Sequence, residues 1–169
     1  MQKTSDTENK FQIAINNPQS EIQQVIMKQE FRCDCPITTA LDVLGDKWML
    51  VIIKQMMIEE METFKDFVES DEAIATNILA AKLKCLEQYG LIKKTNHPTN
   101  KKTKLYRLTE TGLGLAPVLV NLAVWSDTHL REFHPIIRKT KELDAMKVDK
   151  DAFAAFLQKN YREKFPLEA

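Results

Sequence analysis

The change of hydrophobic period at Gly90 constrains the fold of this chain more than any other feature. Before it, Leu79, Leu83 and Leu86 recur at helical spacing within residues 75–89, which predicts one buried helix face. Gly90 follows where a glycine commonly ends a helix. Beyond it, residues 91–94 form a short strand candidate, and apolar and basic residues alternate in 103–108 as in a second strand. The turn-forming residues 97–100 lie between these two segments. The sequence therefore predicts a helix that leads directly into a short β-hairpin.

Terminal signals place the other helices. Pro36 is suited to the first turn of a helix that Gly45 ends, and Asp46 is suited to cap the next one. Thr63 and Asp66 resemble a capping box for a short helix. After the hairpin, Thr109 caps a long helix from 110 to about 133, which should bend between Leu113 and Pro117, and a last helix runs over about 149–164.

This order of elements predicts a mainly α fold with a small β-hairpin (α+β), namely a winged helix-turn-helix with N- and C-terminal dimerisation helices. We expect three parts along the chain. Residues 1–32 form an N-terminal arm, partly disordered or helical around Ile22 to Ile26; residues 33–133 form the winged helix-turn-helix domain; and residues 134–169 form a C-terminal helical extension.

Charge is segregated along a chain whose 24 basic and 24 acidic residues cancel. Residues 82–107 hold eight lysines and arginines against one acid, Glu87, a net charge of +7, so the remainder carries −7. Binding to a polyanion depends on the local field rather than on the sum, so net neutrality does not exclude a nucleic-acid partner.

The side of the 75–89 helix opposite its leucines presents groups suited to double-stranded DNA. Asn77 pairs well with adenine, and Ala80 and Ala81 permit close approach beside a cation, Lys84. Thr76 lies in the first turn, where backbone N–H groups favour a phosphate. The hairpin adds phosphate-binding candidates: Lys101, Lys102, Thr103 and Lys104. The alternative is a winged-helix protein-interaction module without DNA binding, whose polar helix face is merely solvated.

Nothing in the sequence points to catalysis. The four glycines form no phosphate-binding loop, and the motifs of serine hydrolases and zinc proteases are lacking. A zinc site formed by Cys33, Cys35 and the histidines is not expected: His129 and His134 have four residues between them, a spacing seen in zinc sites, but Pro135 would disrupt the helix end there. We therefore expect a protein that is not an enzyme, with no catalytic residues, no cofactor and no metal.

The cellular compartment is predicted from the same composition. Residues 1–10 lack the apolar stretch of a signal peptide, and the longest apolar run, 48–53, is too short to span a bilayer. Three cysteines cannot form a complete intramolecular disulfide framework. We expect a bacterial cytoplasmic protein with free thiols and no membrane contact.

Several segments together resemble the HxlR-type transcriptional regulators over about Cys35 to Leu130. The matching stretches are Cys35-Pro36-Ile37, 41–48, 74–79, 83–87, Gly90-Leu91-Ile92, 106–112, Pro117-Val118-Leu119 and Trp125. The resemblance implies a homodimer built from the helices near 36–44 and 110–133, bound to a palindromic operator, and we expect a repressor. It also implies Cys35 as a thiol sensor, a property of some relatives and not of others; the alternative is an inert buried thiol. The small-molecule effector, if one exists, is unknown.

Overall fold

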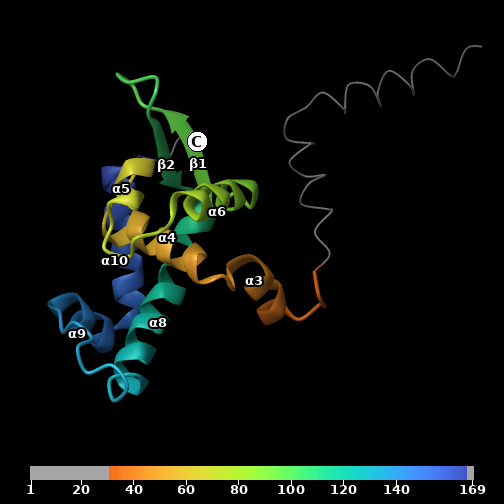
Figure 1. The fold of residues 1–169 in the computed structure, drawn as a ribbon. Helices are drawn as coiled ribbons and strands as arrows, with labels where there is room; N and C mark the ends of the chain where they lie inside the picture. The colour runs from red at the N-terminus through yellow and green to blue at the C-terminus, as the bar shows by residue number, and fades with distance from the viewer. Residues whose placement is uncertain (1–30, 167–169) are drawn as a thin grey trace, which may run out of the picture. The chain divides into compact units, whose positions relative to one another are not determined.

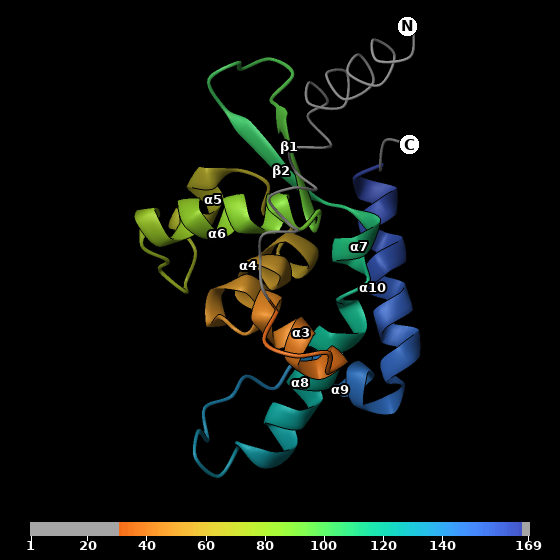
Figure 2. The ribbon, with the colours of Figure 1, turned by 90° about the vertical axis from the view of Figure 1, so that its right-hand side faces the viewer.

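The computed structural model describes residues 31–166, and the chain divides into two compact units, Met1–Gly45 and Asp46–Ala169. Figures 1 and 2 show the elements of each unit in two views. The helical segment expected around Ile22 to Ile26 lies outside the described residues.

The described part of the first unit is a short lead segment, residues 31–35, followed by helix α3, Pro36–Leu44. Cys35 is the N-cap residue, Pro36 occupies the first turn, and the Gly45 N–H donates to the Leu41 carbonyl, as the predicted start and stop required. Arg32 secures the lead, because its Nε lies 2.5 Å from Asp42 Oδ1. No residue of α3 is buried.

The second unit, as far as residue 166, contains nine further elements. In chain order they are α4 (Lys47–Ile58), α5 (Phe64–Val68), α6 (Thr76–Gln88), β1 (Ile92–Asn96), β2 (Lys104–Leu108), α7 (Glu110–Leu113), α8 (Ala116–His129), α9 (Lys141–Val148) and α10 (Lys150–Lys164). The two strands pair antiparallel, with Ile92 opposite Leu108 and Asn96 opposite Lys104.

Helix α4 contributes most to the core of this unit. Its Ile52, Ile53 and Met56 are completely buried, as are Phe67 of α5 and the leucine stripe of α6. Full burial of one such side chain stabilises the fold by about 1.5–3 kcal/mol. Helix α4 contacts α6, α8, α10 and β2, so one apolar helix sets the positions of the elements around it.

Most predicted boundaries are confirmed by their hydrogen bonds. Asp46 accepts from the Trp48 N–H, Thr63 and Asp66 form the reciprocal capping box, and Thr109 accepts from the Gly112 N–H. Gly90 ends α6 at a φ of 66°, where the Leu91 N–H donates to the Leu86 carbonyl over 2.9 Å. A left-handed glycine with this bond is the usual C-terminal stop of a helix.

The prediction of one continuous helix over 110–133 is wrong. The chain forms two helices, α7 and α8, because Pro117 has no N–H to offer the Leu113 carbonyl and is accommodated in the first turn of a new helix. The freed Leu113 carbonyl accepts a hydrogen bond of 3.0 Å from Gln158 of α10 instead. The C-terminal helix therefore satisfies the backbone group that the proline leaves open.

Helix α9 was not predicted as a separate element. Thr140 caps it by accepting from the Leu143 N–H, and its buried residues are Leu143 and Met146. A buried carboxylate joins α9 to α8. Asp127 of α8, whose side chain is 3% exposed, contacts both Arg131, just beyond the end of α8, and Lys147 of α9.

Candidate nucleic-acid interface

Helix α6 separates its apolar and polar sides as its sequence predicted. Leu79, Leu83 and Leu86 are buried, whereas the five predicted contact residues of this helix are all exposed: Thr76, Asn77, Ala80, Ala81 and Lys84. A helix with a continuous exposed face of small and polar residues has the dimensions to enter a major groove about 12 Å wide.

The hairpin tip presents the remaining candidates. Lys101, Lys102 and Lys104 are exposed and Thr103 is half-buried. The loop is ordered by its own hydrogen bonds: the His97 N–H donates to the Thr103 carbonyl over 3.1 Å, and Asn100 Oδ1 accepts from the Lys102 N–H over 3.1 Å. Lys104 is in addition held by Asn96 across the strands. The lysines are thus carried on a defined turn.

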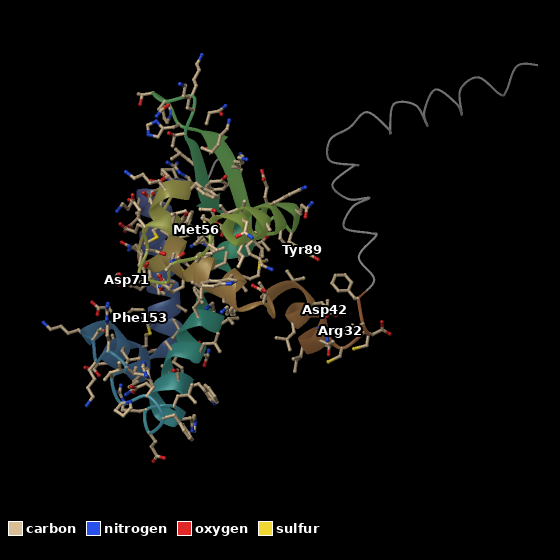
Figure 3. All side chains as sticks on the ribbon, in the orientation of Figure 1. Arg32, Asp42, Met56, Asp71, Tyr89 and Phe153 are labelled. Atoms are coloured by element: carbon tan, nitrogen blue, oxygen red, sulfur yellow. The ribbon has the colours of Figure 1, made fainter. Side chains whose placement is uncertain are left out.

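The two candidate surfaces belong to adjoining elements. Helix α6 contacts β1, and both views show the hairpin extending past α6 at one end of the second unit (Figures 1 and 2). Figure 3 shows side chains along the whole length of the hairpin and of α6. The predicted reading helix therefore adjoins the hairpin, whose far end carries the predicted basic loop.

Lys82 and Arg107 of the basic 82–107 segment are already paired with carboxylates. Lys82 Nζ lies 3.1 Å from Asp46 Oδ2, and Arg107 lies 2.9 Å from Glu62 Oε2. Both therefore stabilise the fold, and the local charge open to a partner is smaller than the sequence count of +7. Lys94 is partly engaged as well, because its Nζ lies 5.7 Å from the centre of the Tyr106 ring.

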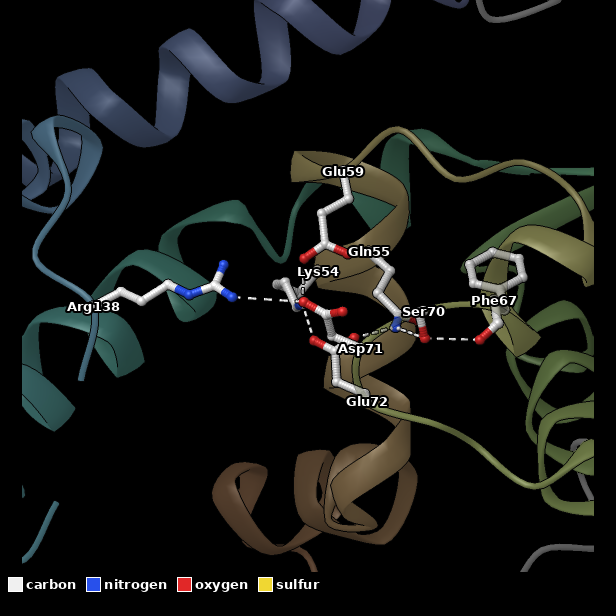
Figure 4. A network of polar contacts seen from close by, with 8 residues as sticks. All are labelled: Lys54, Gln55, Glu59, Phe67, Ser70, Asp71, Glu72 and Arg138. Atoms are coloured by element: carbon white, nitrogen blue, oxygen red, sulfur yellow. Dashed lines mark hydrogen bonds and ion pairs between the residues drawn. The ribbon is translucent and has the colours of Figure 1, made fainter. Parts of the chain in front are cut away.

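The turn between α5 and α6 is held by a polar network that sequence reasoning missed (Figure 4). The amide of Gln55, a completely buried residue of α4, donates to Ser70 Oγ over 2.8 Å and to Glu72 Oε2 over 2.7 Å. Lys54 contacts Glu72 as well and lies 2.5 Å from Glu59. The one available signal was a glutamine inside the apolar stripe of α4, since a buried amide needs partners.

These contacts set the charges of the network. Burial alone would raise the pKa of Glu72, but the hydrogen bonds from Lys54 and Gln55 outweigh it, so the pKa is lowered. Burial likewise opposes the charge on Lys54, yet Glu59 and Glu72 leave its pKa raised. The ion pair therefore persists at neutral pH and fixes the start of the loop that leads into α6.

The cysteines differ in exposure. Cys33 and Cys35 are exposed, so the alternative of a buried Cys35 thiol is wrong, whereas Cys85 is half-buried and burial raises its pKa. The pKa of Cys35 is lowered by hydrogen bonds from the Thr38 backbone and hydroxyl and from the Ile37 backbone. The pKa of Cys33 is lowered by the Cys35 backbone N–H and by the Thr38 hydroxyl.

Two further observations concern ligands and membranes. Across residues 31–166, no group of three or more His, Cys, Asp or Glu side chains gathers in a way that would hold a metal ion. In the same range, no helix is both long and apolar enough to cross a bilayer.

Known proteins resemble this chain over its central region. Residues 43–134 match the model of the HxlR-like helix-turn-helix family. The HTH-type transcriptional regulator YodB of Bacillus subtilis is 32% identical over 94 residues, which cover 55% of this chain and 83% of YodB.

Two solved structures share the fold. The crystal structure of PA1607 superposes with a TM-score of 0.57 at 31% identity, covering 64% of this chain and 73% of PA1607. The redox regulator HypR in its oxidised form gives a TM-score of 0.50 at 28% identity, covering 56% of this chain and 97% of HypR.

These matches confirm the predicted fold class, a mainly helical winged helix with a two-stranded antiparallel sheet. The relatives are named as regulators of transcription rather than as enzymes. The chain belongs to the HxlR-like helix-turn-helix family.

Proposed function

We propose that this protein is a sequence-specific DNA-binding transcriptional regulator, a repressor in the bacterial cytoplasm. The observation that carries the proposal is the exposed face of α6, a helix that contacts the hairpin whose tip exposes the lysines. Asn77, Ala80, Ala81 and Lys84 read base edges in the major groove. Thr76, Lys101, Lys102, Thr103 and Lys104 hold phosphates on either side of it.

The proposed functional unit is a homodimer on a palindromic operator. Support comes from apolar side chains that α3 and α8 each leave in solvent, namely Ile37 and Leu41 on α3 and Val118, Leu122 and Trp125 on α8. The last three follow at helical spacing and so form one stripe. Two-fold symmetry then presents two α6 helices to two half-sites one helical turn apart.

A triple variant of the hairpin tests the DNA-binding surface. Replacing Lys101, Lys102 and Lys104 with Ala removes three cations that neutralise phosphates in each subunit, so affinity for every DNA sequence falls. The slope of log affinity against log salt is negative, and it becomes shallower by about 0.9 for each phosphate that is no longer neutralised. Fluorescence anisotropy with the DNA upstream of the protein's own gene, at several salt concentrations, measures both.

The matched control removes the same charge near α9. The variant with Lys139, Lys141 and Lys150 replaced by Ala should bind with nearly the parent salt slope. Equal slopes for the parent and the hairpin variant would refute the role of the hairpin. If the parent protein retards no DNA at low salt, the protein-interaction module becomes the better account.

Asn77→Ala tests base reading separately from phosphate binding. Removing a bidentate hydrogen-bond pair to a base costs about 1–3 kcal/mol of discrimination at one base pair. The variant should bind its operator more weakly while non-operator DNA is bound as before. Selection from a randomised operator library would show relaxed preference at one position in each half-site, and an unchanged preference would remove Asn77 from the reading surface.

The proposal includes a response to oxidants or electrophiles through Cys35. The support is its exposed thiol at the N-terminus of α3 with a lowered pKa, since the thiolate is the reactive form. Alkylation of Cys35 faster than that of a free thiol at neutral pH is the expected result.

A further inference from the structure

Two exposed thiols lie two residues apart immediately before α3. Cys35 caps the helix, and the backbone bends at Arg32 and at Asp34 on either side of Cys33. The Thr39 hydroxyl lies 3.0 Å from the Cys35 carbonyl oxygen and 3.4 Å from that of Cys33. The Thr39 side chain thus contacts both carbonyls, which lie on the same side of the lead segment.

The two sulfur atoms also share a neighbour. The pKa of both thiols is lowered, in each case partly by the Thr38 hydroxyl. Two extended residues span about 6.6 Å, and a disulfide bridges Cα atoms about 4.4–6.8 Å apart. Two residues of separation therefore fall within the range that a disulfide bridges, and the segment bends at Asp34 between the two cysteines.

We propose that Cys33 and Cys35 form a reversible disulfide within one chain, in which Cys35 is oxidised first and Cys33 resolves it. This assignment rests on the proposed reactivity of Cys35 and adds a role for Cys33. The order follows from the position of each thiol. Cys35 is the N-cap residue of α3, where the helix dipole favours a thiolate, whereas Cys33 lies outside the helix.

The oxidant is a hydroperoxide. The Cys35 thiolate attacks the terminal peroxide oxygen, the O–O bond breaks, and a sulfenic acid forms while an alkoxide or hydroxide leaves. The Cys33 thiolate then attacks the Cys35 sulfur, the S–O bond breaks, and the departing hydroxide takes up a proton to become water. The two thiols lose two electrons in total, and the peroxide gains them.

Cys85 is poorly suited to be the partner within the chain. It lies on α6 in the second unit, it is half-buried, and burial raises the pKa of its thiol. A disulfide between Cys35 of two subunits is the competing product, and the experiment separates the two products by mass.

The test uses the full chain treated with hydrogen peroxide, alkylated, and digested with trypsin. Cleavage after Arg32 and after Lys47 yields one peptide that holds both cysteines and excludes Cys85. The expected peptide is lighter than the reduced one by two hydrogen atoms and resists alkylation until it is reduced. Cys85→Ser should give the same product.

Cys33→Ser supplies the matched variant. Without the resolving thiol, the sulfenic acid at Cys35 should persist and be trapped by dimedone, or pair with a second subunit. If the parent protein forms the intersubunit product or keeps the sulfenic acid while Cys33 stays open to alkylation, the intrachain disulfide is refuted. If Cys35 is oxidised in neither protein, the proposed thiol response itself fails, and the disulfide with it.

A second probe reports proximity without oxidation. Phenylarsine oxide forms two As–S bonds with neighbouring thiols and releases water, so one equivalent should block alkylation of both Cys33 and Cys35. Cys33→Ser should lose this protection, because a single thiol holds the arsenical weakly. Equal protection in both proteins would show that the two sulfur atoms do not act as a pair.

Discussion

At the scale of single residues, Thr38 sets the chemistry of the thiol pair. Its hydroxyl and backbone N–H are among the donors that lower the pKa of Cys35, and its hydroxyl also serves Cys33. In Thr38→Val the backbone donors remain but the hydroxyl is removed, so the pKa of both thiols should rise. The alkylation of Cys35 by iodoacetamide should then slow at neutral pH, with its pH profile displaced to higher pH.

Thr39→Val is the control for that change. The Thr39 hydroxyl contacts the carbonyls of Cys33 and Cys35 rather than their sulfur atoms. Its alkylation profile should therefore stay near that of the parent. Identical profiles for Thr38→Val and the parent would show that the hydroxyl does not tune the thiols.

At the scale of elements, the loop between α5 and α6 depends on its attachment to α4. Glu72→Gln keeps the shape of the side chain but removes the charge that pairs with Lys54. Because the group is partly exposed, we expect a loss of about 1 kcal/mol in the free energy of unfolding at neutral pH. Urea denaturation followed by circular dichroism measures the difference.

The sign of its pH dependence follows from the lowered pKa of Glu72. The carboxylate stabilises the fold above the pKa of the unfolded chain, and this stabilisation is lost as the pH falls through the lower folded pKa. The gap between the parent and Glu72→Gln should therefore close below about pH 4. Glu69→Gln, at an exposed ion pair with Lys65, should show almost no gap at any pH.

Local signals account for what was predictable at this scale, and contacts distant in sequence account for the rest. The caps of α4, α5 and α7, the stop at Gly90 and the exposed face of α6 depend on residues within one or two turns, so the sequence predicts them. Gln55 finds Ser70 and Glu72 fifteen and seventeen residues away, and Arg107 finds Glu62 forty-five residues away. No local pattern indicates such pairs, so the network and the neutralised cations were missed.

At the scale of the whole molecule, the apolar stripe on α8 should determine assembly. Trp125 is 53% exposed, and large aromatic side chains of this kind dominate interface energies. If the stripe covers a second copy of the chain, Trp125→Ala should weaken the dimer by about 2 kcal/mol or more. Light scattering coupled to chromatography over a dilution series measures the change.

Phe156→Ala provides the comparison, because Phe156 of α10 is 57% exposed yet lies outside the proposed interface. Its dimer should dissociate at the same concentration as the parent. A Trp125→Ala protein as dimeric as the parent would contradict the use of α8.

The C-terminal helix completes the hairpin through one hydroxyl. The Leu108 N–H, at the end of β2, donates to the Tyr161 hydroxyl over 2.9 Å, and burial raises the pKa of Tyr161 to about 12. Tyr161→Phe leaves a buried N–H without its partner, which costs about 1–3 kcal/mol. We expect lower stability in urea and faster hydrogen exchange of the Leu108 amide; exchange at the parent rate would contradict this.

This hydrogen bond limits how far the protein can be shortened. The region shared with the family ends at residue 134, whereas Tyr161 and Gln158 satisfy backbone groups at Leu108 and Leu113 from beyond that boundary. A fragment trimmed to the shared region would remove these partners from the Leu108 amide, at the end of the hairpin proposed to bind DNA, and from the Leu113 carbonyl of α7. Although it lies outside the family match, helix α10 therefore acts through its hydrogen bonds as a support of the wing.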